Sequence, residues 1–392
     1  MSEQKPFDII IYGATGYTGR LVAEYMHTAH PGRAGRWAMA GRSADKLAAV
    51  RDEMGLPADT PLVVADASDP ASLKAMADSA KVICTTVGPY TLYGEPLVAA
   101  CVAAGTDYVD LCGEVLWMRQ MIETHGERAS ETGARIVFSC GFDSIPFDLG
   151  VAFAQEATKA KTGQFAQRVR GRVRKMQGTF SGGTAASGKA TMAMVQKDPS
   201  LMPALISPFG LTPGFEGGAQ PKMNVPMEDD TIGAWVAPFF MAVINTKNVH
   251  RSNALLGHPY GTDFQYDEMI VTGPGEAGKA AAEAIASADP MGASGGPKPG
   301  EGPTKEEREA GHYDVLFVAE TADGTRVHAG VTGDKDPGYG STSKILAEAA
   351  LYLADGHCEA AGGLHTPGSA FGTGLVAPLT ERAGMTFQIE QS

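Results

Sequence analysis

Cysteine is scarce in this chain, and its five cysteines form no CxxC pair. A structural zinc site needs ligands paired at short spacing, so the sequence predicts no metal site. Cys84, Cys112 and Cys140 lie within or at the ends of apolar runs. This placement is typical of reduced, buried thiols in a reducing compartment.

The chain also lacks a long apolar run and an excess of positive charge. Its longest apolar run, residues 232–244, is shorter than the ~20 residues of a membrane-spanning helix. Residues 1–6 are polar and contain no apolar signal region, which predicts a cytoplasmic location. The formal net charge of -13 argues against nucleic acid as a partner, because proteins that bind it carry a basic footprint.

The first part of the chain alternates apolar strand patterns with helical patterns. Strand–helix alternation implies parallel strands joined by right-handed crossovers. Two such halves form the doubly wound parallel sheet of the Rossmann fold, so the fold class predicted for residues 1–150 is α/β. The expected strands cover residues 7–11, 37–40, 62–65, 82–87, 108–111 and 135–139.

After residue 160 the pattern changes. Residues 167–175 alternate basic residues with apolar or small ones, and residues 315–331 contain an Asp-Gly turn between two apolar segments, which indicates a β-hairpin. We therefore expect an α+β domain over residues 151–337, built on a mixed or antiparallel sheet. The segment 338–392 is expected to return to the Rossmann domain.

The strongest motif is GATGYTG at residues 13–19, directly after the first expected strand and before a helical pattern. Glycines permit a tight turn and let the backbone approach a pyrophosphate, while the helix N-terminus supplies free N–H groups. An ordinary strand–helix turn is the alternative. The six-strand context favours a dinucleotide site made of Gly13, Thr15, Gly16, Tyr17, Thr18 and Gly19.

The end of the second expected strand indicates which dinucleotide is bound. Enzymes that use NAD usually place an acidic residue there, whereas NADP enzymes offer an arginine to the 2′-phosphate. Here Arg42 and Ser43 follow the strand, with Lys46 one turn on, which favours NADP(H) over NAD. Arg42 also fits a solvent-facing loop arginine. Asp66, after the third strand, fits either an adenine contact or a simple loop carboxylate.

Catalytic candidates are sought at the carboxyl ends of strands four to six, where open α/β sheets bind ligands. No tyrosine has a lysine four residues later, so the proton donor of short-chain dehydrogenases is missing. Val87, Gly88, Pro89 and Tyr90 are expected beside the nicotinamide. Tyr90 fits a proton donor or a packing aromatic, and Asp143 fits a catalytic acid or a helix cap.

Two features of the second domain could meet a substrate. Arg170 and Arg172, on the basic strand, fit the recognition of an acidic substrate, but a solvated sheet face explains them as well. The segment that contains Trp235 and Phe239 fits ordinary core packing. It also fits an acyl-type pocket, a peripheral membrane or lipid contact, or the interface of a homodimer.

Several motifs together resemble the saccharopine dehydrogenase-like oxidoreductase family, in the branch that includes trans-acting enoyl reductases. They are GATGYTG, AGRS (40–43), TTVGPY (85–90), YVDLCGE (108–114), GFDSIPFDLG (141–150), GEGPTKEEREAGHY (300–313), DPGY (336–339) and GLHTP (363–367). The resemblance covers nearly the whole chain and implies a Rossmann domain, a mixed-sheet second domain and a cofactor cleft between them.

Three functions follow as hypotheses. The first is an NADPH-dependent reductase of an apolar or acyl-type (enoyl) small-molecule substrate. The second is a saccharopine-type amino-acid dehydrogenase that acts on an imine and binds substrate carboxylates with the basic strand. The third is a non-catalytic NADP-binding or lipid-associated protein.

Overall fold

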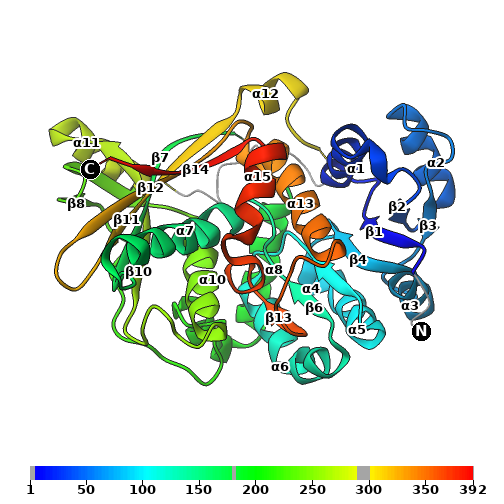
Figure 1. The fold of residues 1–392 in the computed structure, drawn as a ribbon, viewed down its shortest axis with the longest axis horizontal. Coiled ribbons are helices and arrows are strands. Elements are labelled where there is room, and N and C mark those ends of the chain that lie inside the picture. Colours follow the sequence, from blue (N-terminus) through cyan, green and yellow to red (C-terminus); the bar gives the residue numbers. More distant parts are fainter. Residues whose placement is uncertain (1–4, 179–181, 289–300, 392) are drawn as a thin grey trace.

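Two seven-stranded sheets form the framework of the protein (Figure 1). The computed structural model describes residues 5–178, 182–288 and 301–391, without the side chains of residues 182–185. Every pairing in the first sheet is parallel, and the strand order is β13-β6-β5-β4-β1-β2-β3. This order confirms the predicted doubly wound Rossmann sheet, extended at one edge by a late strand.

The elements of the first sheet follow the apolar segments of the sequence. In β1, neighbouring isoleucines are all buried, with Ile9 and Ile11 in one core cluster and Ile10 in the other, because a parallel strand covered by helices buries both faces. The strands are β1 (Phe7–Tyr12), β2 (Trp37–Gly41), β3 (Leu62–Val64), β4 (Ala80–Thr85), β5 (Asp107–Val109), β6 (Arg135–Val137) and β13 (Gly363–His365). The helices are α1 (Tyr17–Ala29), α2 (Ala44–Glu53), α3 (Pro70–Ser79), α4 (Tyr90–Tyr93), α5 (Glu95–Ala104) and α6 (Val115–Thr132).

The second sheet is mixed, as predicted, with the order β14-β12-β11-β7-β10-β9-β8. Only the β10–β7 pairing is parallel within the described sheet. Its strands are β7 (Arg168–Gln177), β8 (Met227–Asp229), β9 (Ala234–Pro238), β10 (Gln265–Gly273), β11 (His312–Glu320), β12 (Arg326–Gly333) and β14 (Met385–Glu390). The remaining helices are α7 (Ile145–Thr162), α8 (Gly182–Lys197), α9 (Met202–Ile206), α10 (Ala242–Leu255), α11 (Gly275–Ser287), α12 (Lys305–Ala310), α13 (Thr342–Ala354), α14 (Pro367–Phe371) and α15 (Val376–Arg382).

Two long segments tie the sheets together. Helix α7 starts directly after the turn that follows β6 and packs on β11 and β12, where a Cβ on Gly150 would lie 2.3 Å from the ring of Phe317. The C-terminal segment divides between the sheets: α13 packs on α1, β1 and β4, β13 extends the Rossmann sheet, and β14 pairs with β12. The return to the Rossmann domain expected for residues 338–392 therefore describes only part of this segment.

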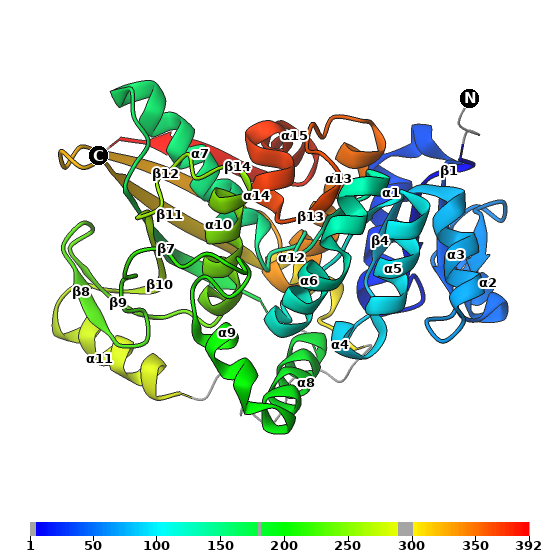
Figure 2. The same cartoon turned by 90° about the horizontal axis from the view of Figure 1, so that it is seen from below.

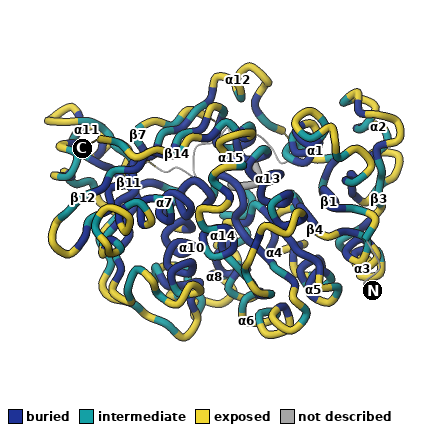
Figure 3. Tube along the Cα trace, in the orientation of Figure 1, coloured by how far each residue is buried: buried dark blue, intermediate teal, exposed yellow. Residues whose placement is uncertain are grey.

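Buried positions follow both sheets and the helices α7, α10 and α13 (Figure 3). All five cysteines are buried and unpaired. In the second view, α4, α8 and α9 lie along the lower edge of the molecule (Figure 2), and α4 contacts α8. Among the described residues, no helix is long and apolar enough to cross a membrane.

Candidate active site

The glycine-rich turn connects β1 to α1 and leaves the start of that helix open. Gly13 has a φ of +93°, a conformation that favours glycine, and Gly16 occupies the N-cap position without a side-chain cap. The first N–H groups of α1 therefore have no side-chain acceptor at the cap and can meet an anion, as the sequence predicted for a pyrophosphate site. Gly16 is exposed, whereas Thr15 and Thr18 are partly buried.

Tyr17, the first residue of α1, is held by a segment that sequence reasoning did not connect to it. Its hydroxyl donates to the carbonyl of Pro303 and accepts from Arg308, whose guanidinium lies over the ring. The ring also meets Tyr339 edge-on, with centroids 4.8 Å apart. A Cβ on Gly302 would collide with the same ring, so this segment packs closely on the cofactor turn.

Arg42 and Asp66 stand at the carboxyl ends of β2 and β3. Arg42 is exposed and makes no ion pair with any residue that the structure describes, so its guanidinium is open to a ligand. Ser43 caps α2 by accepting from the backbone N–H of Lys46 at 3.3 Å. Asp66 accepts from the backbone and hydroxyl of Ser68, and these bonds, helped by the charge of Arg42, lower its pKa.

The wall predicted for the nicotinamide follows β4. Gly88 is exposed, Val87 and Pro89 are partly buried, and Tyr90 is buried. The Tyr90 hydroxyl accepts from the backbone N–H of Leu111 at 3.0 Å, and its ring packs on Trp117 with centroids 5.4 Å apart. Burial raises the pKa of Tyr90 well above its usual value. These contacts agree with a packing aromatic rather than a solvent-facing proton donor.

Two carboxyl groups lie at the ends of β5 and β6. Asp110 accepts from the backbone of Cys112 and Ser139 and from the hydroxyl of Tyr108, yet its burial raises its pKa to about 7. Burial, reinforced by the charge of Asp110, also raises the pKa of Asp143 well above its usual range. The Asp143 Oδ2 atom is shielded from solvent and has no hydrogen-bond partner among the described residues.

Helix α10 fixes the turn that carries Asp143. The hydroxyl of Ser144 accepts from Asn248 at 2.8 Å and donates to Asn245 at 3.3 Å, and it makes no cap bond to α7. Both asparagines are fully buried on α10. The second domain therefore reaches into the cofactor edge of the first and holds the turn in place.

Glu114 is the residue whose contacts the sequence least revealed. It stands at the N-cap position of α6, but its side chain makes no cap bond there. Instead it accepts from the backbone N–H groups of Tyr90 and Thr91, each at 2.8 Å, and from two hydroxyl groups. Only its position after a strand of the cofactor sheet could have indicated this role.

Residues 9–137 match the family described as the saccharopine dehydrogenase NADP binding domain. A Mycobacterium ulcerans protein named trans-acting enoyl reductase is 40% identical, over 97% of this chain and 97% of its own length. A Mycobacterium tuberculosis protein of the same name is 39% identical over 96% of each chain. The chain belongs to the saccharopine dehydrogenase-like oxidoreductase family.

A solved structure agrees with this assignment at the level of fold. The apo saccharopine dehydrogenase (L-Glu forming) of Saccharomyces cerevisiae covers 98% of this chain and 99% of its own, with a TM-score of 0.53 and 12% identity. The cofactor of this family's first domain is NADP(H). The open start of α1 and the unpaired Arg42 fit that cofactor, because they offer N–H groups and a cation to phosphates.

A solvated sheet face was one expectation for the basic strand, and it is wrong for Arg170 and Arg172. Arg172 is 1% exposed and pairs with Asp229 and Asp267, each at 2.6 Å, while Arg170 is 8% exposed and pairs with Glu320 at 3.2 Å. β7 lies in the middle of the sheet, where Asp267 on β10 and Glu320 on β11 belong to the two adjacent strands, and Asp229 comes from β8 at the edge. In this structure both guanidinium groups are occupied by protein carboxylates, which leaves little for a substrate carboxylate.

The apolar segment 232–244 is divided between β9 and the start of α10. Phe239 is buried and packs on Phe147, with centroids 5.7 Å apart. Trp235 is partly buried on β9 under the ammonium of Lys279. Phe239 therefore belongs to the core, as its apolar context allowed.

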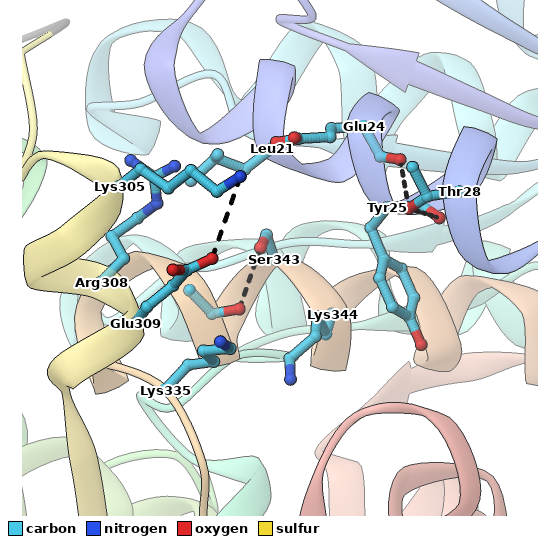
Figure 4. A pocket seen from close by; sticks show the side chains of 11 residues that line it. Leu21, Glu24, Tyr25, Thr28, Lys305, Arg308, Glu309, Lys335, Ser343 and Lys344 are labelled. Carbon is cyan, nitrogen blue, oxygen red and sulfur yellow. Dashed lines mark hydrogen bonds and ion pairs between the residues drawn. The ribbon is translucent and has the colours of Figure 1, made fainter.

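A small pocket of 160 Å³ lies behind the cofactor turn, between α1, α12 and α13 (Figure 4). Two of its cationic side chains are paired with acids: Lys305 lies 4.0 Å from Glu309, and Lys344 lies 2.8 Å from Asp334. Arg308 turns toward Tyr17. The lining is Leu21, Glu24, Tyr25, Thr28, Lys305, Arg308, Glu309, Lys335, Gly340, Ser343 and Lys344.

Proposed function

We propose that this protein is an NADPH-dependent reductase of the carbon–carbon double bond of an acyl-type, enoyl substrate. The observation that carries the proposal is the Oδ2 atom of Asp143, which is buried without a hydrogen-bond partner among the described residues in the turn after β6. Burial, reinforced by the charge of Asp110, raises the pKa of this carboxyl group, which favours its protonated form. Reduction of an enoyl group consumes one hydride and one proton, so a neutral acid in this turn supplies what the cofactor does not. The names of the mycobacterial relatives support the same reaction.

In this proposal each group of residues contacts a different part of the cofactor. The turn Gly13–Gly19 and the start of α1, with Thr15, Tyr17 and Thr18, receive the pyrophosphate. Arg42, assisted by Ser43 and Lys46, receives the 2′-phosphate, and Asp66 faces the adenosine. The wall formed by Val87, Gly88, Pro89 and Tyr90 lies beside the nicotinamide.

Asp143 is the proton donor in this proposal. NADPH held by these residues would supply a hydride for the β-carbon of the double bond. The carboxyl of Asp143 then gives its proton to the α-carbon and becomes a carboxylate, which regains a proton from solvent. Asp110 assists because its charge keeps the pKa of Asp143 high.

The saccharopine-type reaction has less support. It requires cations for substrate carboxylates, and the candidates Arg170 and Arg172 are already paired with Glu320, Asp229 and Asp267. A reductase of an apolar chain makes no such demand. Trp235, which is partly buried on β9, remains a proposed contact for that chain, whereas Phe239 packs in the core.

The test compares enoyl thioesters of increasing chain length with an oxo acid plus lysine or glutamate, by following NADPH oxidation. Each buried methylene should gain ~0.8 kcal/mol until the pocket is full, so kcat/KM should rise with chain length. Turnover only with the amino-acid pairs, lost in Arg170→Ala, would establish the dehydrogenase instead. NADPH binding without turnover of either substrate class would establish a non-catalytic protein.

A further inference from the structure

Glu114 accepts four hydrogen bonds from two segments, α4 and α8. Its Oε1 accepts from the backbone N–H of Tyr90 and from the hydroxyl of Ser187, at 2.8 and 2.6 Å. Its Oε2 accepts from the backbone N–H and the hydroxyl of Thr91. Glu114 is 1% exposed and makes no ion pair among the described residues, so these four donors stabilise its carboxylate.

One of these donors, the N–H of Tyr90, belongs to the predicted nicotinamide wall, and Thr91 follows it directly. The N–H groups of Tyr90 and Thr91 open α4, immediately after Gly88 and Pro89. Two charge-assisted bonds from one buried carboxylate hold this backbone more firmly than neutral bonds would. The position of the wall therefore depends on where Glu114 lies.

A third donor comes from the second domain. Ser187 belongs to α8, which follows β7 of the mixed sheet in the sequence, yet α8 packs on α4 and α6 of the first domain. Met194, two turns later on α8, approaches the hydroxyl of Thr91 at 3.8 Å. Helix α8 thus contacts both the carboxylate of Glu114 and Thr91, one of the residues that this carboxylate binds.

We infer that Glu114 and Ser187 form a latch that sets the nicotinamide wall only when α8 is docked against it. Both are positioning residues, since neither is placed among the reacting atoms. The inference rests on the proposed reductase function for its catalytic readout. It adds that productive hydride geometry depends on a contact supplied by the substrate domain.

The first experiment removes the hydroxyl with Ser187→Ala and restores it with Ser187→Thr. With an enoyl thioester, Ser187→Ala should lower kcat by about 10- to 100-fold, because small displacements of reacting atoms have large effects on rate. NADPH affinity and Tm should stay near wild type, and Ser187→Thr should recover most of kcat. Lys189→Ala, at an exposed site on α8, should match wild type throughout.

The second experiment uses no substrate. Ser187→Ala should weaken the rise in nicotinamide fluorescence on NADPH binding and speed hydrogen exchange at the amides of Tyr90 and Thr91. Glu114→Gln should do so more strongly, because in either orientation its NH2 group faces a backbone N–H. Glu123→Gln, at an exposed site on α6, is its control and should change neither signal.

The two experiments distinguish a failure of the proposed reductase function from a failure of the latch. If wild type does not reduce enoyl thioesters, the proposed function fails, while the fluorescence and exchange measurements still decide the latch. Wild-type fluorescence and exchange in Ser187→Ala would overturn the latch even if Glu114→Gln fails to fold. A loss of kcat in Ser187→Ala would also overturn the latch if it merely accompanies a fall in Tm and is not recovered by Ser187→Thr.

Discussion

A Cβ atom on Gly19 would lie 2.2 Å from the carbonyl oxygen of Gly13, which closes the cofactor turn against the first turn of α1. The same atom on Gly16 would lie 3.3 Å from that oxygen, at an exposed position with ordinary extended backbone. The motif therefore contains one glycine, Gly19, whose Cβ would overlap the backbone, and one, Gly16, whose Cβ would make only a tight contact. Gly16 is the one free to serve the approach of the pyrophosphate.

Substitutions at these two glycines should have different effects. Gly19→Ala should lower the free energy of unfolding by about 1–3 kcal/mol or more, because backbone must move to admit the methyl group. Gly16→Val should keep a near-native Tm but lose NADPH binding, because its side chain would occupy the pyrophosphate space. Thermal melts and fluorescence titrations measure both. A stable Gly16→Val with wild-type affinity would move the pyrophosphate away from this turn.

Arg42→Ala should reduce the preference for NADPH over NADH. Loss of a charge-assisted bond to the 2′-phosphate should cost about 1.5–3 kcal/mol of NADPH binding and leave NADH affinity unchanged. Arg51→Ala, on the next helix and paired with Asp52, is the matched control and should retain the preference. Equal losses for both cofactors in Arg42→Ala would contradict a 2′-phosphate contact.

The pH profile should identify the proton donor. Asp143 is active when protonated, so reduction should be present below its raised pKa and disappear as pH rises through that value. Asp110→Asn removes the negative charge that raises the pKa of Asp143, so the alkaline limb of kcat should move to lower pH. Asp143→Asn should lose most of kcat, and Asp198→Asn, at an exposed site, should leave the profile unchanged. An unshifted limb in Asp110→Asn would exclude this pair as its origin.

Arg172→Met should destabilise the protein whatever its substrate is. It leaves Asp229 and Asp267 buried without their shared cation, and breaking a buried pair in this way typically costs about 3–5 kcal/mol. Arg119→Met, which breaks the more exposed pair with Glu123, should cost only about 0–1 kcal/mol. Chemical denaturation measures both. A neutral Arg172→Met would mean that this ion pair does not hold β7 in the sheet.

The sequence by itself determined the parallel sheet, the glycine turn and the hairpin of the second domain. β1, β2 and the β11–β12 pair lie within a few residues of where periodicity and turn residues predicted them. These features are local, because apolar spacing, glycine and the Asp-Gly turn act on neighbouring residues. The family motifs extend the same local information to the cofactor.

Only the tertiary structure decided which charged groups meet. The alternating pattern of β7 favoured a solvated face. In the structure β7 is a central strand, and Arg172 forms ion pairs with Asp229 and Asp267, which come from distant parts of the chain. The side chain of Glu114 binds residues 90, 91 and 187 instead of capping its own helix, and the hydroxyl of Tyr17 binds Pro303 and Arg308. A local pattern states which face of an element is polar. The partner on that face is set by the order in which strands and helices pack.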